Sequence, residues 1–408
     1  MSEKAEKTKK LSTEPYKGVR DFYPGCMAVQ SYIFDIWKKT AESFGYEEYG
    51  ASVLEPANLY KAKSGEEIVN EQTYTFIDRG EREVTLRPEM TPTLARMVAA
   101  KKRELIFPLR WYSIPNLFRY EQPQRGRVRE HWQLNVDLFG VNGIEADVEV
   151  ISLAYKVMKN FGAKDEDFEI RVNSRNILRK IFEGKLINES FLSTAVRLLD
   201  RKDKMKPGEF EKGIKEITSK PIDLYIKADK EIEDLLQNLR LQGVNNVKFD
   251  STLARGFDYY TGMVFEIFDT NPSNRRALFG GGRYDDLTSL FGGDKIPAVG
   301  FGMGDVGIRN FLETRNLLPK IKAPADYYIC VMGQEEAGFA EKKAQELRDN
   351  PPAGGARVAI DFTYKKIGDQ IKSADKRGIP NVIIIGPEEV KSGKVKVKNL
   401  KTGEEKEL

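Results

Sequence analysis

The sequence predicts a mixed α/β protein with more than one domain. Its 408 residues exceed the size of one ordinary domain, and at about 150 residues per domain they correspond to two or three. Apolar residues make up 40% and charged residues 31%, a composition that supports a sizeable core and argues against global disorder. Strand-like and helix-like patterns both occur, and the pattern changes after Pro319. We therefore expect a large domain followed by a smaller α/β domain.

The first part of the chain predicts a long helix followed by pairs of strands. Residues 27–44 have helical spacing, because Ile33, Trp37 and Ala41 share one stripe. The strand-like runs that follow are 51–56, 73–77, 83–86, 115–121 and 128–140. The turn 78–80 joins the second and third of these runs into a hairpin, and the loop 122–127 joins the last two.

The middle of the chain is mainly helical. Residues 145–161 have a helical pattern, and residues 165–245 are charged with little strand signal, which indicates a helical insertion. Strand patterning returns at 246–268. The glycines at 280–282 predict a tight turn before a helical run at 284–291.

After Pro319 strands and helices alternate, as in a small α/β domain. We expect strands at 327–331, 357–362 and 382–385, and helices at 336–348 and 365–377. The end of the chain from Glu388 is rich in lysine and glutamate and is expected to form an exposed hairpin. The predicted division of the chain is a flexible tail over 1–16, a first domain over 17–320 and a second domain over 322–408.

Composition excludes several kinds of site. Cys26 and Cys330 are the only cysteines and lie far apart, which excludes a zinc ribbon, a CxxC redox site and a disulfide scaffold. His131 is the only histidine, so a His-clustered metal site is excluded and a Ser-His-Asp triad is open only with His131 as its base. The sequence has no Walker A pattern, which disfavours a P-loop ATPase. We therefore expect chemistry based on arginine, carboxylates, tyrosine and backbone, with no metal held by a His/Cys cluster.

Charge and hydropathy give no sign of a membrane or of export. The chain has 66 Lys and Arg against 62 Asp and Glu, and this net charge of +4 excludes a histone-like protein but allows a local basic site. No run of 18 apolar residues is present. The polar start, MSEKAEKTKKLSTEP, lacks the apolar core of a signal peptide. We therefore expect no membrane association and a cytoplasmic location.

The segment 117–140, LFRYEQPQRGRVREHWQLNVDLFG, carries the strongest site signal. In its second strand the polar parity is Arg129, His131, Gln133, Asn135 and Asp137, and the apolar parity is Trp132, Leu134, Val136 and Leu138. A surface strand gives the same split. However, the preceding strand adds Arg119 and Glu121, and the loop adds Arg125 and Arg127. Because the planar guanidinium makes paired, charge-assisted hydrogen bonds, this set favours a site for phosphate and a small polar ligand.

This segment resembles motif 2 of class II aminoacyl-tRNA synthetases, and in detail the histidyl-tRNA synthetase family. KGVRDFYP (17–24) is similar to that family's opening motif, and GYEEYGASVLEP (45–56) resembles motif 1. TLRPEMT (85–91) resembles its substrate-binding segment TLRPEGT. LARGFDYYTGMVFE (253–266) and FGGGRYDDL (279–287) are similar to its two histidine-specific signatures. The likeness runs from about residue 17 to residue 390, and several motifs in order are far more specific than any one alone.

The resemblance implies both a fold and an activity. The first domain would be a class II catalytic domain on an antiparallel sheet, with the helical insertion at about 165–245, and the second an α/β anticodon-binding domain. The activity implied is that of an aminoacyl-tRNA synthetase. It would activate histidine with ATP and Mg²⁺ to histidyl-adenylate and transfer it to the 3′ end of tRNA(His). Motif 1 implies a homodimer, so the partners implied are L-histidine, tRNA(His) and a second copy of the chain.

The resemblance also assigns roles to single residues. Arg119 would hold the ATP α-phosphate and the substrate carboxylate, and Arg255 would stabilise charge on the α-phosphate. The histidine-binding set would be Glu89, Met90, Thr91, Arg119, Gln133, Asp137, Arg255, Tyr259 and Tyr260, with Asp137 and Tyr260 on the imidazole. The ATP-binding set would be Arg119, Glu121, Arg127 and His131, and the tRNA contacts Arg125 and Arg127. By themselves, Tyr259 and Tyr260 also fit core aromatics and Arg255 a surface ion pair.

Three positions depart from the family's pattern. In GFGMGDVGIRNFLE, Val306 and Gly307 stand where motif 3 has Glu-Arg. Arg309 lies about 200° further around a helix and is a poor substitute, so another arginine or Mg²⁺ is left to meet the γ-phosphate. Met90 replaces a glycine, which would narrow the pocket. His131 stands where an aromatic packs on adenine, so we expect it either to stack there or to have a structural role.

Two other readings of the whole chain stay open. One is a non-catalytic paralogue that binds histidine as a regulatory subunit. The C-terminal domain and the intact LARGFDYYTG segment oppose this interpretation, and the altered motif 3 favours it. The other is a related class IIa synthetase, such as a prolyl or threonyl enzyme, which RPEMT favours and the DYYTG and GGGRYD segments oppose.

The second domain carries four lysines, which are either a phosphate-contacting face or part of a solvated helix: Lys365, Lys366, Lys372 and Lys376.

Overall fold

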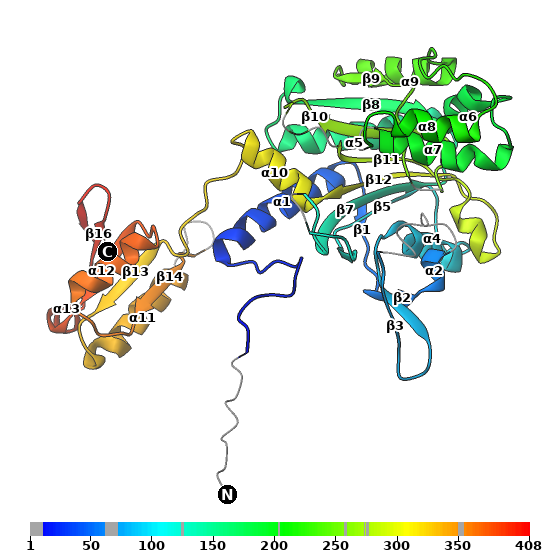
Figure 1. Cartoon of the computed structure of the whole chain (residues 1–408). Helices are drawn as coiled ribbons and strands as arrows, with labels where there is room; N and C mark the ends of the chain where they lie inside the picture. Colours follow the sequence, from blue (N-terminus) through cyan, green and yellow to red (C-terminus); the bar gives the residue numbers. More distant parts are fainter. Residues whose placement is uncertain are drawn as a thin grey trace, which may run out of the picture. The chain divides into compact units, whose positions relative to one another are not determined.

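The computed structural model describes residues 11–61, 72–123, 126–202, 205–256, 259–272, 274, 277–349 and 355–408 (Figure 1). The chain divides into two compact units, Met1–Pro319 and Lys320–Leu408, and each is described by itself. Both units combine helices with strands, so the predicted mixed α/β class is confirmed. Among the described helices, none is long and apolar enough to cross a membrane.

A nine-stranded sheet forms the centre of the first unit within the described ranges. In spatial order its strands are β1 (Glu47–Glu48), β5 (Leu109–Ser113), β7 (Glu130–Phe139), β12 (Ala298–Gly304), β11 (Ala277–Arg283), β10 (Met263–Asp269), β8 (Phe168–Ser174) and β9 (Val247–Phe249), with β6 (Asn116–Phe118) paired to β7. All pairs from β5 to β8 are antiparallel. Only the outer pairs of these described strands, β1–β5 and β8–β9, are parallel. The antiparallel sheet expected from the resemblance is therefore confirmed.

Two helices, α1 (Pro24–Ser43) and α5 (Ile144–Asn160), share one apolar cluster with this sheet. The stripe predicted for α1 is buried, and the indole N–H of Trp37 donates to Sδ of Met303 on β12 at 2.9 Å. Strand β7 adds its apolar parity, Leu134, Val136 and Leu138, each at most 1% exposed. The polar parity of β7 consequently faces the other side of the sheet.

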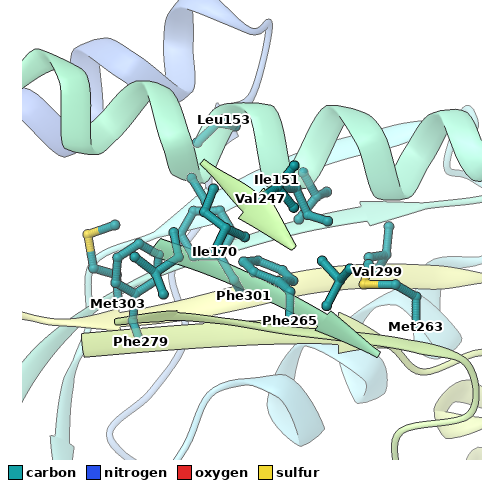
Figure 2. Close-up of a cluster of buried hydrophobic side chains, with 14 of the residues drawn as sticks. Ile151, Leu153, Ile170, Val247, Met263, Phe265, Phe279, Val299, Phe301 and Met303 are labelled. Atoms are coloured by element: carbon teal, nitrogen blue, oxygen red, sulfur yellow. The ribbon is translucent and has the colours of Figure 1, made fainter. Parts of the chain in front are cut away.

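The centre of this cluster is aromatic. Figure 2 shows Phe265 of β10 and Phe301 of β12 beneath Ile151 of α5, and the two rings lie 6.3 Å apart. Phe279 of β11 packs on Phe301 at 5.7 Å. The rings of three adjacent strands thus pack on one another and share one apolar cluster with α5. This packing stabilises one face of the sheet, and the opposite face carries polar residues.

The tight turn predicted at 280–282 is wrong. These glycines lie inside strand β11, paired with β12. A Cβ at Gly281 would collide with the backbone oxygen of Gly300, so glycine serves a close approach of strands here and not a turn. The predicted helix at 284–291 is reduced to the short 3₁₀ helix η4 (Leu287–Phe291).

The helical insertion predicted at 165–245 contains one strand that the sequence did not reveal. Strand β8 pairs with β10 in the central sheet, because Phe168, Ile170 and Val172 alternate and are buried within an otherwise charged stretch. The helices that follow are α6 (Arg175–Phe182), η2 (Glu189–Phe191), α7 (Leu192–Arg201), α8 (Glu209–Ile217) and α9 (Lys230–Leu241), after the turn η1 (Asp165–Asp167).

The other described elements of the first unit surround the sheet. A small antiparallel sheet has the order β2 (Leu54–Pro56), β4 (Glu83–Leu86) and β3 (Tyr74–Ile77), which confirms the predicted hairpin. The remaining helices are α2 (Asn58–Lys61), α4 (Thr91–Lys101) and α10 (Asp305–Thr314). Strand β6 is shorter than the predicted run 115–121, and Arg119 and Glu121 follow its end.

The second unit is the predicted alternation of strands and helices. Its sheet has the order β14 (Val358–Asp361), β13 (Tyr327–Val331), β15 (Asn381–Ile385), β16 (Lys396–Asn399) and β17 (Glu405–Glu407). The first three of these strands are parallel, and β16 and β17 form the expected hairpin, which pairs with β15. The helices are η5 (Gln334–Glu336), α11 (Ala337–Asp349), α12 (Ile367–Lys376) and α13 (Pro387–Ser392).

We predict that Phe265→Ala lowers the free energy of unfolding of the first unit by about 3–5 kcal/mol, because it removes a fully buried ring. Tryptophan fluorescence in a urea titration measures this unit alone, since Trp37, Trp111 and Trp132 are the only tryptophans. Ile106, 87% exposed, is the control, and its replacement by alanine is expected to change stability by less than about 0.5 kcal/mol. Equal effects of the two variants would contradict the packing in Figure 2.

Candidate active site

A cavity lies on the polar face of the central sheet. Strands β7, β11 and β12 supply its floor, and loop residues supply its walls. Its lining is Glu89, Thr91, Arg119, Gln133, Asn135, Asp137, Arg255, Tyr259, Tyr260, Gly280, Tyr284, Gly300, Phe301 and Gly302. Residues from six separate parts of the sequence therefore meet in one place.

Glycines on β12 make room for the polar side chains of β7. In the register of the two strands, Gly300 pairs with Asp137 and Gly304 pairs with Gln133. A Cβ at Gly300 would collide with Oδ1 of Asp137, and one at Gly302 would collide with Nε2 of Gln133. Both side chains consequently lie across the floor of the cavity, where larger residues on β12 would displace them.

Tyr284, which the sequence analysis did not select, holds the carboxyl of Asp137. Its hydroxyl donates a short hydrogen bond to Oδ1 of Asp137. Two edge-on aromatic contacts fix the ring of Tyr284, one to Phe139 at 5.9 Å and one to Tyr259 at 5.8 Å. The segment FGGGRYDDL had drawn attention to this region, but only the fold brings Tyr284 of its loop onto β7.

The Asp137 carboxyl is poised near neutrality. Burial raises its pKa to about 7, while the hydrogen bond from Tyr284 acts in the opposite direction. A carboxyl in this state is able either to accept a hydrogen bond when ionised or to donate one when protonated. Asp137 is thus suited to a ligand group that itself gains or loses a proton near pH 7.

Tyr259 and Tyr260 form a buried aromatic wall. Their rings lie 4.9 Å apart, and the Tyr259 hydroxyl donates to Oε2 of Glu89 at 3.2 Å. Burial raises the pKa of both phenols, and the Glu89 carboxylate adds to that rise at Tyr259, so both hydroxyls stay neutral. The two tyrosines are core aromatics that also line the cavity. The core role considered from the sequence is therefore compatible with a role in the site.

Arg255 enters the cavity from the loop before β10. Its Nη1 is paired with Oε1 of Glu266 at 2.8 Å, and its guanidinium lies 5.7 Å from the centre of the Tyr260 ring. Within the described part of the chain its Nε is buried with no hydrogen-bond partner. A Cβ at Gly280 would collide with Nη1, so the glycine makes room for this arginine. The surface ion pair considered from the sequence is therefore wrong: the side chain is largely buried, at 14% exposed.

Arg119 brings a second cation to the cavity. It follows the end of β6, where its backbone N–H still donates to the carbonyl of Arg129 at 2.9 Å, and its Nε donates to the Pro88 carbonyl at 2.9 Å. Two of its neighbours in the sequence, Glu121 and Arg127, pair with each other at 3.4 Å and do not line the cavity. Arg125, predicted to contact tRNA, lies outside the described residues.

His131 lies on the polar parity of β7 but outside the lining of the cavity. It is half-buried, and burial together with the charges of Arg119 and Arg20 lowers its pKa to about 3. The imidazole is therefore neutral at physiological pH. Because the two arginines and burial keep the imidazole of His131 neutral, it is unsuited to proton transfer near pH 7. Its flat, neutral ring is suited to stacking.

The helix that follows β12 is anchored through Asp305 at its first turn. Asp305 is fully buried and accepts from the backbone N–H of Trp132 at 3.1 Å, from Arg20 at 2.8 Å and from Gln30 at 3.0 Å. Arg309 pairs instead with Glu313 at 2.9 Å and does not line the cavity. Asp305 thus holds Arg20 at the start of α10. There the charge of Arg20 is close enough to His131 to lower the pKa of its imidazole.

Most of the predicted histidine site comes together in the cavity. The members that line it are Glu89, Thr91, Arg119, Gln133, Asp137, Arg255, Tyr259 and Tyr260. Met90 is 1% exposed at the start of α4 and is not among the lining residues, so a narrowing of the pocket by Met90 stays a prediction. The lining residues absent from the predicted set are Asn135, Gly280, Tyr284, Gly300, Phe301 and Gly302. Gly280 belongs to the glycine run that the sequence marks as permitting φ > 0 or close backbone approach, whereas Gly300 and Gly302 gave no signal because their role depends on which side chain approaches them.

The charges in the cavity match those of a free amino acid. Glu89 and Asp137 offer carboxyl oxygens, and Arg119 and Arg255 offer guanidinium groups, around a neutral aromatic wall. An ammonium group, a carboxylate and a polar side chain would each find an oppositely charged or hydrogen-bonding partner. The described residues contain no group of three His, Cys, Asp or Glu side chains placed to hold a metal ion.

Comparison with known proteins assigns the family. Residues 18–208 and 215–304 match the family model described as histidyl-tRNA synthetase, and residues 326–408 match one described as anticodon binding domain. The chain belongs to the histidyl-tRNA synthetase family. The motifs recognised from 17 to 390 are therefore the family's own, and the predicted resemblance is confirmed.

Relatives and solved structures agree with this family over nearly the whole chain. The histidine–tRNA ligase of Leptospira biflexa is 42% identical over 419 residues, covering 97% of this chain and 94% of the relative. That of Thermoplasma volcanium is 38% identical over 422 residues, covering 97% and 96%. The crystal structure of apo S. aureus histidyl-tRNA synthetase has a TM-score of 0.75 at 25% identity, covering 98% of this chain and 97% of that one.

We predict that Tyr284→Phe raises the pKa of Asp137 above its present value of about 7, because the lost hydrogen bond is the contact that lowers it. Carboxyl ¹³C shifts of labelled aspartate, followed against pH, measure this change. Tyr46→Phe is a matched control, since that phenol is buried but donates to Glu149. A titration of Asp137 that stays in place or moves to lower pH in Tyr284→Phe would contradict the proposed hold on its carboxyl.

Proposed function

We propose that this protein is a histidine–tRNA ligase, which joins histidine to tRNA(His) with ATP. The observation that carries the proposal is a cavity that combines family signature residues with both charges of an amino acid and a carboxyl titrating near pH 7. Full-length similarity to enzymes named histidine–tRNA ligase supports the same activity.

Asp137 and the tyrosines provide selectivity for histidine in this proposal. The imidazole would meet Asp137 on the floor of the cavity and the hydroxyl of Tyr260 on its wall, while Glu89, Thr91 and Gln133 take the ammonium group. Other amino acids would leave these buried polar groups without hydrogen-bond partners. The free-energy cost of the unpaired groups would weaken the binding of those amino acids. Tyr284 keeps the Asp137 carboxyl in place before the substrate arrives.

The first step requires positioning and charge neutralisation, which the two arginines and Mg²⁺ would supply. The histidine carboxylate is already ionised at neutral pH, so no general base is required. One of its oxygens bonds to the α-phosphorus of ATP as the bond from that phosphorus to pyrophosphate breaks. Arg119 and Arg255 would position the reactants and stabilise the charge on the α-phosphate. The second step transfers the histidyl group to the terminal ribose hydroxyl of the tRNA and releases AMP.

Mg²⁺ would enter this site with ATP. The described residues hold no preformed cluster of metal ligands, and Mg²⁺ commonly binds one or two carboxylates together with substrate phosphates. Glu121 is the carboxylate of motif 2 available for such a contact beside Arg127. Arg20, held by Asp305 near His131, is the candidate to replace the motif 3 arginine at the phosphates.

The two rival readings are less consistent with these observations. A histidine-binding regulatory paralogue has no need of Arg255 in the cavity or of a C-terminal anticodon-binding domain, and the chain has both. The side chains of proline and threonine do not ionise, so neither would make use of the Asp137 carboxyl, whose pKa burial raises to about 7. We further propose that the enzyme acts in the cytoplasm as a homodimer, supported by the motif 1 resemblance and by relatives that serve translation.

We expect ATP–pyrophosphate exchange with histidine and no exchange above background with proline or threonine. Purified protein, ATP, Mg²⁺, labelled pyrophosphate and one amino acid at a time make up the assay. Arg255→Gln keeps a polar but shorter side chain and removes its charge, and it is expected to lower kcat about 10²–10³-fold. Exchange with none of the three amino acids would defeat the enzyme proposal, and exchange with proline or threonine would reassign it.

We also expect His131→Ala to raise the KM for ATP about two- to tenfold, because an aromatic stacking contact on adenine is lost. His131→Phe, which keeps a flat ring, should retain the KM of the unmodified enzyme, and the KM for histidine should change in neither variant. Because the pKa of His131 is about 3, the effect should be the same at pH 6 and pH 8. An unchanged KM for ATP in His131→Ala would leave this histidine a structural role only.

A further inference from the structure

We propose that Asp147, on α5, is a positioning residue for the cavity that takes histidine. Asp147 is not among the residues that line the cavity, but it holds Arg283 at the end of β11. Arg283 in turn fixes Tyr284 and the segment that carries Tyr260. The inference rests on the proposed function for its ligand. It goes beyond that function by naming a residue outside both the cavity and the signature segments.

Asp147 and Arg283 form a buried ion pair with two hydrogen bonds. Nε of Arg283 donates to Oδ1 of Asp147 at 3.2 Å, and Nη2 donates to Oδ2 at 2.7 Å. Asp147 is 4% exposed and Arg283 is 7% exposed. Paired hydrogen bonds between a planar guanidinium and a carboxylate fix the orientation of both groups, so the side chain of Arg283 has little freedom to move.

The other donors of Arg283 bind the backbone that leads into α5. Nη1 donates to the carbonyl of Val141 at 3.0 Å, and Nη2 donates to that of Gly143 at 3.1 Å. Every nitrogen of the guanidinium therefore has an acceptor. The three partners lie within residues 141–147, and α5 shares the apolar cluster of the sheet. Arg283 thus ties the end of β11 to the core of the first unit.

The alternation along β11 carries this anchoring to the cavity. Arg283 has the same parity as Phe279, whose ring lies in the apolar cluster with α5. The opposite parity carries Gly280 and Tyr284, which line the cavity. Because Tyr284 follows Arg283 directly, a fixed Arg283 restricts the direction in which the Tyr284 ring leaves the strand. That ring is the one whose hydroxyl binds Asp137.

The backbone of Arg283 extends the same anchoring to the second signature segment. Its carbonyl accepts a hydrogen bond from the N–H of Thr261 at 2.8 Å, and Thr261 follows Tyr260 directly. Asp285 adds a second connection, because its carboxyl accepts from the hydroxyl of Thr261 at 2.7 Å. Its backbone N–H donates to the same hydroxyl at 3.1 Å. The segment that places Tyr260 on the wall of the cavity is therefore held by the same arginine.

Placement explains this buried pair better than stability does. Removing two charges from water costs free energy that offsets their attraction, and apolar residues of similar volume often replace such pairs without loss of stability. That cost is visible at Asp147, because burial raises the pKa of its carboxyl to about 6 although Arg283 acts in the opposite direction. A cavity that selects a small polar ring, however, requires its hydrogen-bonding groups at fixed positions.

The first test measures histidine-dependent ATP–pyrophosphate exchange. Asp147→Asn keeps the size of the side chain but removes its charge and turns one acceptor into a donor that faces Arg283. It is expected to raise the KM for histidine about three- to tenfold, as for one weakened hydrogen bond, and to change the KM for ATP less than about twofold. Arg283→Lys keeps the charge but not the planar fork, and it should raise the KM for histidine in the same way.

Asp165→Asn is the matched control. Asp165 accepts from Lys159 at 2.9 Å, so this variant also removes a carboxylate that is paired with the first unit's α5, but at the other end of the helix. Both KM values should stay unchanged. A rise in the KM for histidine as large as that in Asp147→Asn would show that any loss of charge beside α5 has this effect, and would overturn the proposal.

A double variant separates positioning from folding. Asp147→Leu combined with Arg283→Met replaces the pair by apolar side chains of similar volume, which buried sites often tolerate. A urea titration followed by tryptophan fluorescence reports whether the first unit remains folded. A positioning role predicts a raised KM for histidine in this folded variant, whereas a purely structural role predicts the KM of the unmodified protein and would overturn the proposal.

The Asp137 carboxyl gives a readout that requires no substrate. If Asp147 acts through Tyr284, the titration of Asp137 in Asp147→Asn moves to higher pH, as expected for Tyr284→Phe. A titration that stays in place would overturn the proposal. Because it is recorded without histidine or ATP, it tests the positioning role separately from the activity. Absence of histidine-dependent exchange in the unmodified protein would count against the proposed function alone.

Discussion

The two-residue repeat of β7 is the constraint on which the first unit depends. Its apolar parity is locked into the cluster beneath α1 and α5, and its polar parity therefore has to face the cavity. A shift of one residue would place Asp137 in the core and Val136 in the cavity. The same strand thus stabilises the fold and positions the Asp137 carboxyl in the cavity.

Glycines complete this arrangement from the neighbouring strands. Gly300 and Gly302 leave space for side chains of β7, and Gly280 leaves space for Arg255. Glycine inside a strand costs conformational entropy and offers no side chain to pack. The fold tolerates that cost here because the other face is well packed by rings such as Phe265 and Phe301. Stability on one side of the sheet thereby permits a polar, crowded site on the other.

The sequence predicted what depends on local pattern and missed what depends on distant contact. The parity of β7, the helix stripe of α1 and the alternation of the second unit are local and are confirmed. Strand β8 was missed because its period-two signal is short and lies within a charged stretch. The role of Tyr284 was missed because its partner on β7 is 147 residues away. The glycines at 280–282 were assigned to a turn because the sequence does not distinguish a glycine that permits φ > 0 from one that permits the close approach of a neighbouring strand.

The neutral His131 has a practical consequence for spectroscopy. Its pKa of about 3 means that the chain's only imidazole keeps one protonation state across the neutral range. An imidazole resonance that moves with pH between 6 and 8 would therefore belong to the bound amino acid and not to the protein. The protonation of a bound imidazole would thereby be observable directly in the unmodified protein.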